Sequence, residues 1–200
     1  MFKFGLSTLV IVSLAMASCS SDPAAKAPQN TARADSLTAN TPVPNLWKDK
    51  VCDLITDQEF YTLFNVDEKR DFANKRSLVT NGGFCLRTWK KPDWREREIR
   101  EQQNPNVVAN PESALAVEVL DYSTPATCAA QYEMAKNNKA NGYSTQVPGL
   151  GEGALWSETA SMLLVKKGTV CLQIKLDHAD VANDNLPLAK EVAILALKKL

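Results

Sequence analysis

The sequence predicts an α+β domain in which helices pack on a mainly antiparallel sheet. Helix-start signals open three segments, apolar and polar residues alternate along several others, and glycine-containing turns separate neighbouring strands. The predicted order is helix, three strands, helix, three strands, helix. Strands that pair are then far apart in the sequence, which is typical of this class.

The first helix is predicted to begin at Asp57. Thr56 and Glu59 match a capping box, in which each side chain accepts a hydrogen bond from a backbone N–H of the other residue. Ile55 and Phe60 occupy the two positions of a hydrophobic staple. Together these signals satisfy and fix the first helical turn.

Three strands are expected next. Residues 77–80 and 84–89 flank Asn81-Gly82-Gly83, whose glycines tolerate the positive φ of a tight turn, so we expect an antiparallel hairpin. Residues 114–122 alternate in hydrophobicity and are predicted to form the third strand.

The second half of the chain repeats this arrangement. Thr124 as N-cap and Pro125 at the first helical position open a helix that runs to about Lys139 and closes near Gly142. The strands that follow are predicted at residues 155–159, 161–166 and 169–176. A last helix is predicted with Asn185 as its cap, Pro187 in its first turn, and Lys198 and Lys199 in its last turn.

Both faces of the sheet are expected to be covered, at least in part. Along the last strand, Val170, Leu172, Ile174 and Leu176 share one face, while Cys171, Gln173 and Lys175 share the other. A link from Cys171 to the helix that carries Cys128 would place this helix over the more polar face. We therefore expect an α/β/α sandwich.

Composition excludes several classes of protein. The 200 residues include 23 Lys and Arg and 23 Asp and Glu, so there is no net charge that favours binding to nucleic acid. The hydrophobic fraction of 44% is near the globular average and excludes both a disordered and a collagen-like chain. Residues 47–200 match the size of a single domain.

The N-terminus has the pattern of a secretory signal. Residues 4–16 form an uncharged, mostly apolar run that is too short to span a membrane. Met16-Ala17-Ser18-Cys19 resembles the lipobox of bacterial lipoproteins. This resemblance implies removal of residues 1–18 and lipidation of Cys19, with acyl chains such as palmitate anchoring the protein outside the cytoplasm. The alternative is an ordinary secretory signal that leaves a free thiol at Cys19.

Residues 19–46 are predicted to be a lipidated cysteine followed by a flexible tether. They are rich in Ala, Pro, Ser, Asn and Thr and contain no aromatic residue, so they cannot bury enough surface to offset the entropy of ordering. The alternative is an arm that packs on the domain. The residue after Cys19 is the neutral Ser20. In Gram-negative lipoproteins a neutral residue at this position usually accompanies sorting to the outer membrane, so the resemblance implies that location if the host is Gram-negative.

Four cysteines remain in the domain, namely Cys52, Cys85, Cys128 and Cys171. In an oxidising compartment an even set is most simply two disulfides, with three possible connectivities. We favour Cys52 with Cys85 and Cys128 with Cys171, because each bond then joins a residue at or near a helix to one in a predicted strand. A metal or redox site is disfavoured, since there is no C-x-x-C and no second histidine.

The order of several short motifs resembles a family. Residues 52–59 (CDLITDQE), 85–89 (CLRTW) and 147–156 (VPGLGEGALW) are similar to secreted lipoproteins of bacterial envelopes with C-x-L-L-T, C-x-W and G-L-G-D-x-A motifs. Arg87-Thr88 lengthens the second motif, Glu152-Gly153 departs from the third, and residues 91–111 look inserted. The resemblance implies a PsbP-like fold and a non-enzymatic envelope role, with no catalytic residue.

Two segments are candidates for binding. Trp94 and Arg95 combine an aromatic ring with a cation, which suits stacking on and pairing with a ligand. Gly149, Gly151 and Glu152 lie in a glycine-rich segment that is predicted to be a turn before a strand rather than a phosphate-binding loop before a helix.

Three functions remain open. The favoured one is a lipid-anchored, non-enzymatic binding or interaction module of the envelope, with an envelope protein or a small molecule as its partner and no cofactor. The second is a cation-dependent hydrolase centred on Asp177, His178 and Asp180, which include the only histidine. The third is a structural or inhibitory envelope protein.

Overall fold

A computed structural model of the chain describes residues 46–47, 50–79 and 83–200. The expected signal peptide, Cys19 and nearly all of the tether lie outside these residues, as does most of the predicted turn at 81–83. The described residues belong to a compact unit assigned to Thr41–Leu200.

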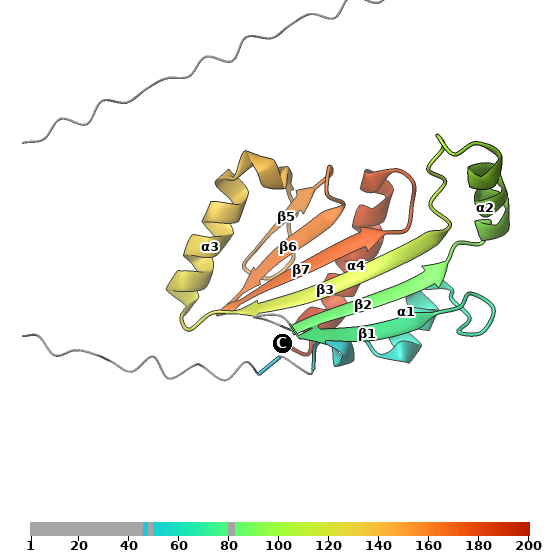
Figure 1. The fold of residues 1–200 in the computed structure, drawn as a ribbon. Helices are drawn as coiled ribbons and strands as arrows, with labels where there is room; N and C mark the ends of the chain where they lie inside the picture. The colour runs from blue at the N-terminus through green and yellow to red at the C-terminus, as the bar shows by residue number, and fades with distance from the viewer. Residues whose placement is uncertain (1–45, 48–49, 80–82) are drawn as a thin grey trace, which may run out of the picture. The chain divides into compact units, whose positions relative to one another are not determined.

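A seven-stranded sheet with the order β1-β2-β3-β7-β6-β5-β4 forms the centre of this unit. Every neighbouring pair is antiparallel, which confirms the predicted α+β class with a mainly antiparallel sheet. The strands are β1 (Asn74–Val79), β2 (Gly83–Lys90), β3 (Glu112–Asp121), β4 (Tyr143–Gln146), β5 (Gly153–Ser157), β6 (Met162–Lys167) and β7 (Val170–Asp177). The central pairing of β3 with β7 joins the two halves of the domain (Figure 1).

Four α-helices lie within the described residues: α1 (Asp57–Phe64), α2 (Trp94–Gln103), α3 (Pro125–Asn137) and α4 (Leu186–Leu197). Short 3-10 turns are found at η1 (Val51–Asp53), η2 (Lys139–Asn141) and η3 (Ala182–Asn185). The capping box predicted at the start of α1 is confirmed, because Thr56 Oγ1 accepts from Glu59 N at 3.2 Å and Glu59 Oε2 accepts from Thr56 N at 2.8 Å.

Helices cover the two faces of the sheet unequally. The alternation predicted for β7 is confirmed: Val170, Leu172, Ile174 and Leu176 belong to the main core with α1 and α4, while Cys171 belongs to a smaller cluster beneath α3. Figure 1 shows α4 and α1 behind the sheet and α3 on the other side. The expected α/β/α layering is therefore present, but α3 covers only the part of its face near β5, β6 and β7.

Several predicted details need correction. Asn185 precedes α4, but its side chain does not cap this helix; Oδ1 accepts from His178 N and Ala179 N instead. Lys198 and Lys199 lie beyond the last helical residue, Leu197. Two elements were not predicted at all, the edge strand β4 and the helix α2, which begins at Trp94 within the segment that looked inserted.

The first of the two favoured disulfides is present. Cys52 next to α1 and Cys85 in β2 are bonded, with their Cα atoms 5.0 Å apart. Cys128 and Cys171 are free thiols in this structure, although they lie beside each other. Among the described residues, no helix is both long enough and apolar enough to cross a bilayer.

Candidate ligand-binding site

A hollow of about 710 Å³ lies where α1, the end of β2 and the start of α2 meet. It is called the α2 hollow below. Its lining residues are Phe64, Asn65, Val66, Arg70, Asp71, Trp89, Lys90, Pro92, Trp94, Arg95, Glu96 and His178. Trp94 and Arg95, predicted from the sequence as binding residues, are thus brought together with groups from three other parts of the chain.

Aromatic rings form the inner wall of the α2 hollow. Phe64 and Trp89 are buried, and their ring centroids lie 5.0 Å apart. The half-buried His178 ring lies 5.6 Å from Trp89 and 5.8 Å from Phe64. Such packed rings form a rigid apolar surface on which a flat group of a ligand can stack.

Trp94 forms the outer wall of the α2 hollow, and two cations lie close to its ring. Lys90 Nζ lies 5.3 Å and Arg95 Cζ 5.0 Å from the centroid of its ring. Phe72 meets the same ring edge to face at 5.8 Å. The indole is thereby held in place while it is only partly buried, which leaves ring surface available to a ligand.

Phe72 has an unusual backbone for its residue type. Its φ is 53°, in the left-handed region, and 61% of the residue is exposed. A bulky residue rarely adopts this conformation, and such strain concentrates at functional sites. Phe72 is thus a strained, exposed aromatic residue at the edge of the α2 hollow.

Charges in the α2 hollow are mixed, but cations are in excess. Arg70 is paired with Asp71 at 2.7 Å, and Lys90 is paired with Glu98 at 3.0 Å. Among the described residues, Arg95 has no such ion pair. Its exposed guanidinium is therefore the cation in this hollow that is most readily used for a ligand anion.

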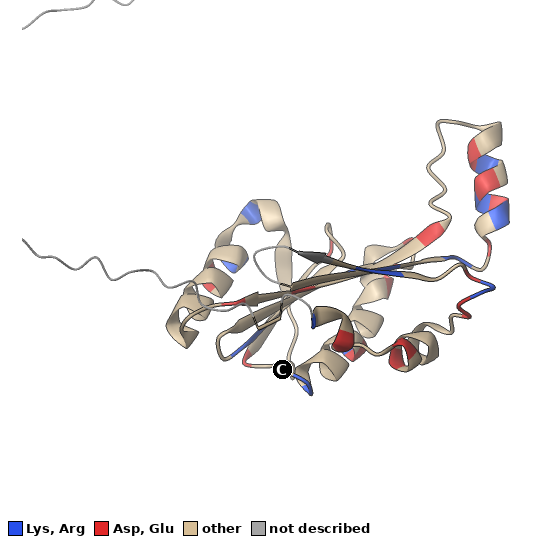
Figure 2. Cartoon of the chain, turned by 60° about the horizontal axis from the view of Figure 1, so that its bottom comes forward, with Lys and Arg blue, Asp and Glu red and all other residues tan. Residues whose placement is uncertain are grey.

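The position of α2 depends on charged side chains rather than on apolar packing. None of its residues is buried. Asp180, in the loop before α4, accepts from Lys91 Nζ at 3.0 Å and from Arg97 at 2.9 and 3.0 Å. Arg97 and then Lys91 lower the pKa of Asp180 from 3.8 to about 2. Figure 2 shows the dense cover of acidic and basic residues along α2.

The three residues of the alternative hydrolase site do not converge on one point. Asp180 is occupied by its contacts with Lys91 and Arg97, which are called the α2 clamp below. Asp177 accepts from Asn110 Nδ2 at 2.9 Å. His178 Nδ1 shares a hydrogen bond of 3.1 Å with Ser113 Oγ, but Ser113 is fully buried and out of reach of a substrate. Within the described ranges, no three His, Cys, Asp or Glu residues are placed to hold a metal ion.

The other predicted binding residues lie at the opposite end of the strands. Gly149, Gly151 and Glu152 line a separate hollow of about 600 Å³, next to the start of β5. The Glu152 carboxylate is already engaged, accepting from Gly168 N at 2.8 Å and pairing with Lys166 at 3.1 Å. The hydrogen bond from Gly168 N contributes most to lowering the pKa of Glu152, and the contact with Lys166 lowers it further. Together these contacts connect two neighbouring turns.

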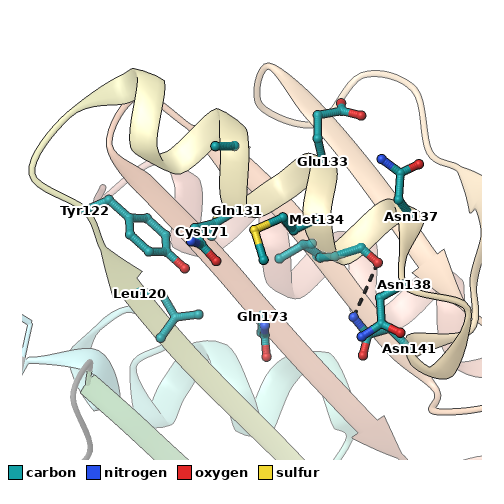
Figure 3. A pocket seen from close by; sticks show the side chains of 13 residues that line it. Leu120, Tyr122, Gln131, Glu133, Met134, Asn137, Asn138, Asn141, Cys171 and Gln173 are labelled. Atoms are coloured by element: carbon teal, nitrogen blue, oxygen red, sulfur yellow. Dashed lines mark hydrogen bonds between the residues drawn. The ribbon is translucent and has the colours of Figure 1, made fainter. Parts of the chain in front are cut away.

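A third hollow, of about 660 Å³, lies between α3 and the sheet (Figure 3). It is called the α3 groove below. Leu120, Tyr122, Met134, Cys171 and Gln173 are among its lining residues, and Figure 3 shows Met134 extending from α3 over the strands. No sequence pattern predicted this groove, because its lining comes from β3, α3, β6 and β7, which only the sheet order and the packing of α3 bring together.

Comparison of the chain with protein-family models, with curated proteins and with solved structures gives no match.

Proposed function

We propose that this protein is a lipid-anchored, extracytoplasmic binding module without enzymatic activity, and that the α2 hollow is its ligand site. The lipobox-like sequence at Cys19 supports the anchor, and the linker that follows supports display of the domain away from the membrane. The observation that carries the ligand site is the convergence of Trp94, Arg95 and His178 on an aromatic wall.

The chemistry of the α2 hollow suggests a ligand with a flat apolar part and an anionic group. The flat part would stack against Trp94, which is only partly buried and lies in front of the buried Trp89, while Arg95 would receive the anion. His178 offers a further polar contact, because Nδ1 is held by Ser113 and no partner for Nε2 is found among the described residues. Burial, followed by the charge of Lys91, lowers the pKa of His178, which favours the neutral ring.

A binding role has more support than the two alternatives. A cation-dependent hydrolase would need Asp177, His178 and Asp180 to face a common point, and each is engaged with a different partner. A purely structural or inhibitory protein would be favoured by a flat apolar surface, whereas the described surface has several hollows.

Equilibrium dialysis of the detergent-solubilised protein with three matched probes tests this proposal. The probes share a naphthalene ring and carry a sulfonate, a neutral hydroxymethyl or an ammonium group. We expect the sulfonate to bind most tightly and the ammonium most weakly. Trp94→Ala should weaken binding of the sulfonate about tenfold, the loss that corresponds to ~1.4 kcal/mol, and Arg95→Gln should reduce the preference for the sulfonate.

Glu152→Ala is the matched control, because it removes a surface carboxylate at the other end of the strands. The sulfonate should bind this variant as it binds the unmodified protein. Equal binding of the sulfonate to the Trp94→Ala variant and the unmodified protein would refute the placement of the site in the α2 hollow.

A further inference from the structure

Cys128 and Cys171 are placed to react with each other. Their Sγ atoms lie 3.1 Å apart, one on α3 and the other on β7, although the two residues are 43 positions apart in the sequence. Cys128 is completely buried and Cys171 is 2% exposed. Since Cys52 and Cys85 are bonded to each other, these two thiols are each other's remaining partner in the domain.

Little else attaches α3 to the sheet. Of its 13 residues, only Cys128 and Tyr132 are buried. Tyr132 packs against Gly153 so closely that a Cβ there would lie 3.0 Å from the tyrosine oxygen. By contrast, α4 buries Ala189, Val192, Ala193 and Ala196 in the main core. The attachment of α3 therefore depends on few side chains: Tyr132, Ala135, which packs against the same small cluster, and the two cysteines.

We propose that in the exported protein Cys128 and Cys171 form a second disulfide, and that this bond is the main attachment of α3 and so fixes one wall of the α3 groove. Cys171 lines that groove together with Met134 of α3 and Gln173 of β7 (Figure 3). Without the bond, only the noncovalent packing of α3 seen in this structure would hold the helix, so α3 would open more often and the groove would lose a fixed wall.

The bond forms by exchange with a disulfide oxidant, such as glutathione disulfide. One cysteine, as its thiolate, attacks a sulfur of the oxidant and releases one thiol, which leaves a mixed disulfide. The thiolate of the second cysteine then attacks the protein sulfur of this mixed disulfide and releases the second thiol. Two electrons pass from the protein to the oxidant, and the two protons lost by the protein thiols are taken up by the leaving groups.

Burial supports the durability of this bond once it has formed. Burial raises the pKa of the Cys171 thiol above its usual value, so this thiol is rarely ionised in the folded state. Thiol–disulfide exchange at Cys171 is then fastest before α3 docks on the sheet. Once the Cys128–Cys171 bond has formed, its burial shields it from reductants. Cys52 is only half-buried, which makes the Cys52–Cys85 bond the more accessible of the two.

The first test is a disulfide map of the full chain. Protein purified from its native host is alkylated under denaturing, non-reducing conditions and digested, and the peptides are identified by mass spectrometry. We expect a peptide pair joined through Cys128 and Cys171. A bond from either residue to Cys52 or Cys85 would overturn the proposal.

The second test distinguishes a wrong cysteine pairing from a wrong cellular location. This distinction is needed because the inference rests on the proposed export of the protein. Reduced, purified protein is refolded with glutathione disulfide. Failure of the Cys128–Cys171 bond to form would overturn the pairing. Formation in vitro, combined with free thiols at both residues in the native material, would support the pairing and contradict the extracytoplasmic location.

The third test measures the attachment of α3. In the Cys52→Ala/Cys85→Ala background, tryptic cleavage after Lys136 is compared between the oxidised and the reduced full chain, which differ in no side chain except at the two sulfurs. We expect reduction to accelerate cleavage about tenfold or more. If this background does not fold, wild-type protein is compared with and without reductant. Reduction then also breaks the Cys52–Cys85 bond, and cleavage after Lys190 in α4 is the internal control for the effect of that loss. Equal rates after Lys136 would show that the bond does not hold α3.

Discussion

Ser113 Oγ lies 3.1 Å from His178 Nδ1 and fixes the only histidine of the chain at the base of the α2 hollow. The serine comes from the start of β3 and the histidine from the residue after β7, two strands that pair from Ala114 with Asp177 to Asp121 with Val170. The hydrogen bond orients the ring against Trp89, with a centroid separation of 5.6 Å. A buried serine here serves as a positioning group for the aromatic wall.

Stability is expected to depend on pH through His178. Its pKa is lowered from 6.5, first by burial and then by Lys91, while Asp177 opposes the shift. As the pH falls below about 6.5, the unfolded chain therefore binds a proton before the folded chain does, and the free energy of unfolding decreases. Urea unfolding between pH 7 and about 5 should show this decrease, because carboxylates titrate mainly below that range. In the His178→Asn variant the decrease should disappear; its persistence would show that another group causes it.

Asp180→Asn is expected to release α2. The substitution weakens the contacts to Lys91 and Arg97, and Lys91 is only 3% exposed, so its charge would lose its partner. Hydrogen exchange in Trp94–Gln103 should accelerate, and the naphthalene sulfonate should bind more weakly. Asp184→Asn, an exposed carboxylate in the same loop, is the control. Unchanged exchange in the Asp180 variant would contradict the proposed clamp.

The same clamp should be sensitive to acid. The pKa of Asp180 is lowered from 3.8 to about 2. Its contribution to stability is therefore complete above about pH 4 and is lost as the pH falls toward 2.

Phe72→Asn is expected to raise the stability of the protein while it weakens binding of the sulfonate. Asparagine tolerates the left-handed φ of 53°, so the free energy of unfolding should rise by about 1 kcal/mol. The edge-to-face contact with Trp94 is lost at the same time, and the affinity for the sulfonate should fall roughly threefold to tenfold. Phe72→Leu should lower the affinity without the gain in stability. Higher stability with full affinity would remove Phe72 from the site.

Two glycines of the 149–153 segment should respond differently to substitution. Both Gly149 and Gly151 have positive φ, at 80° and 54°. A Cβ on Gly149 meets nothing within 4 Å, whereas one on Gly151 would collide with the carbonyl oxygen of Lys166. Gly149→Ala should therefore cost about 1–2 kcal/mol and Gly151→Ala roughly 2–5 kcal/mol. Equal midpoints in chemical denaturation would contradict this distinction.

Local signals predicted most of the fold. The capping box at Thr56 and Glu59 located α1, and Thr124-Pro125 located α3, because these signals act within a few residues. The edge strand β4 escaped prediction because its residues, YSTQ, do not alternate in hydrophobicity and are largely exposed. The segment WREREIREQQ of α2 has no apolar face, and its position is set by Asp180, more than 80 positions away.

The candidate site could be predicted only in part, because contacts between distant parts of the chain leave no local signal in the sequence. Trp94 and Arg95 are adjacent in the sequence, so their combination of an aromatic ring and a cation could be recognised there. Phe64 lies in α1, Trp89 in β2 and His178 in the loop after β7, and no local pattern indicates that they meet. The order of β2, β3 and β7 in the sheet brings them together, and this order is a long-range property of the chain.

Mass spectrometry of the N-terminal peptide would show whether the protein is anchored outside the cytoplasm, on which both the proposed binding role and the second disulfide depend. The full-length gene product is extracted from membranes with detergent and digested. We expect a mature chain that begins at Cys19, with a thioether-linked diacylglyceryl group on the sulfur. A chain that retains residues 1–18, or an unmodified thiol at Cys19, would contradict the proposed anchoring.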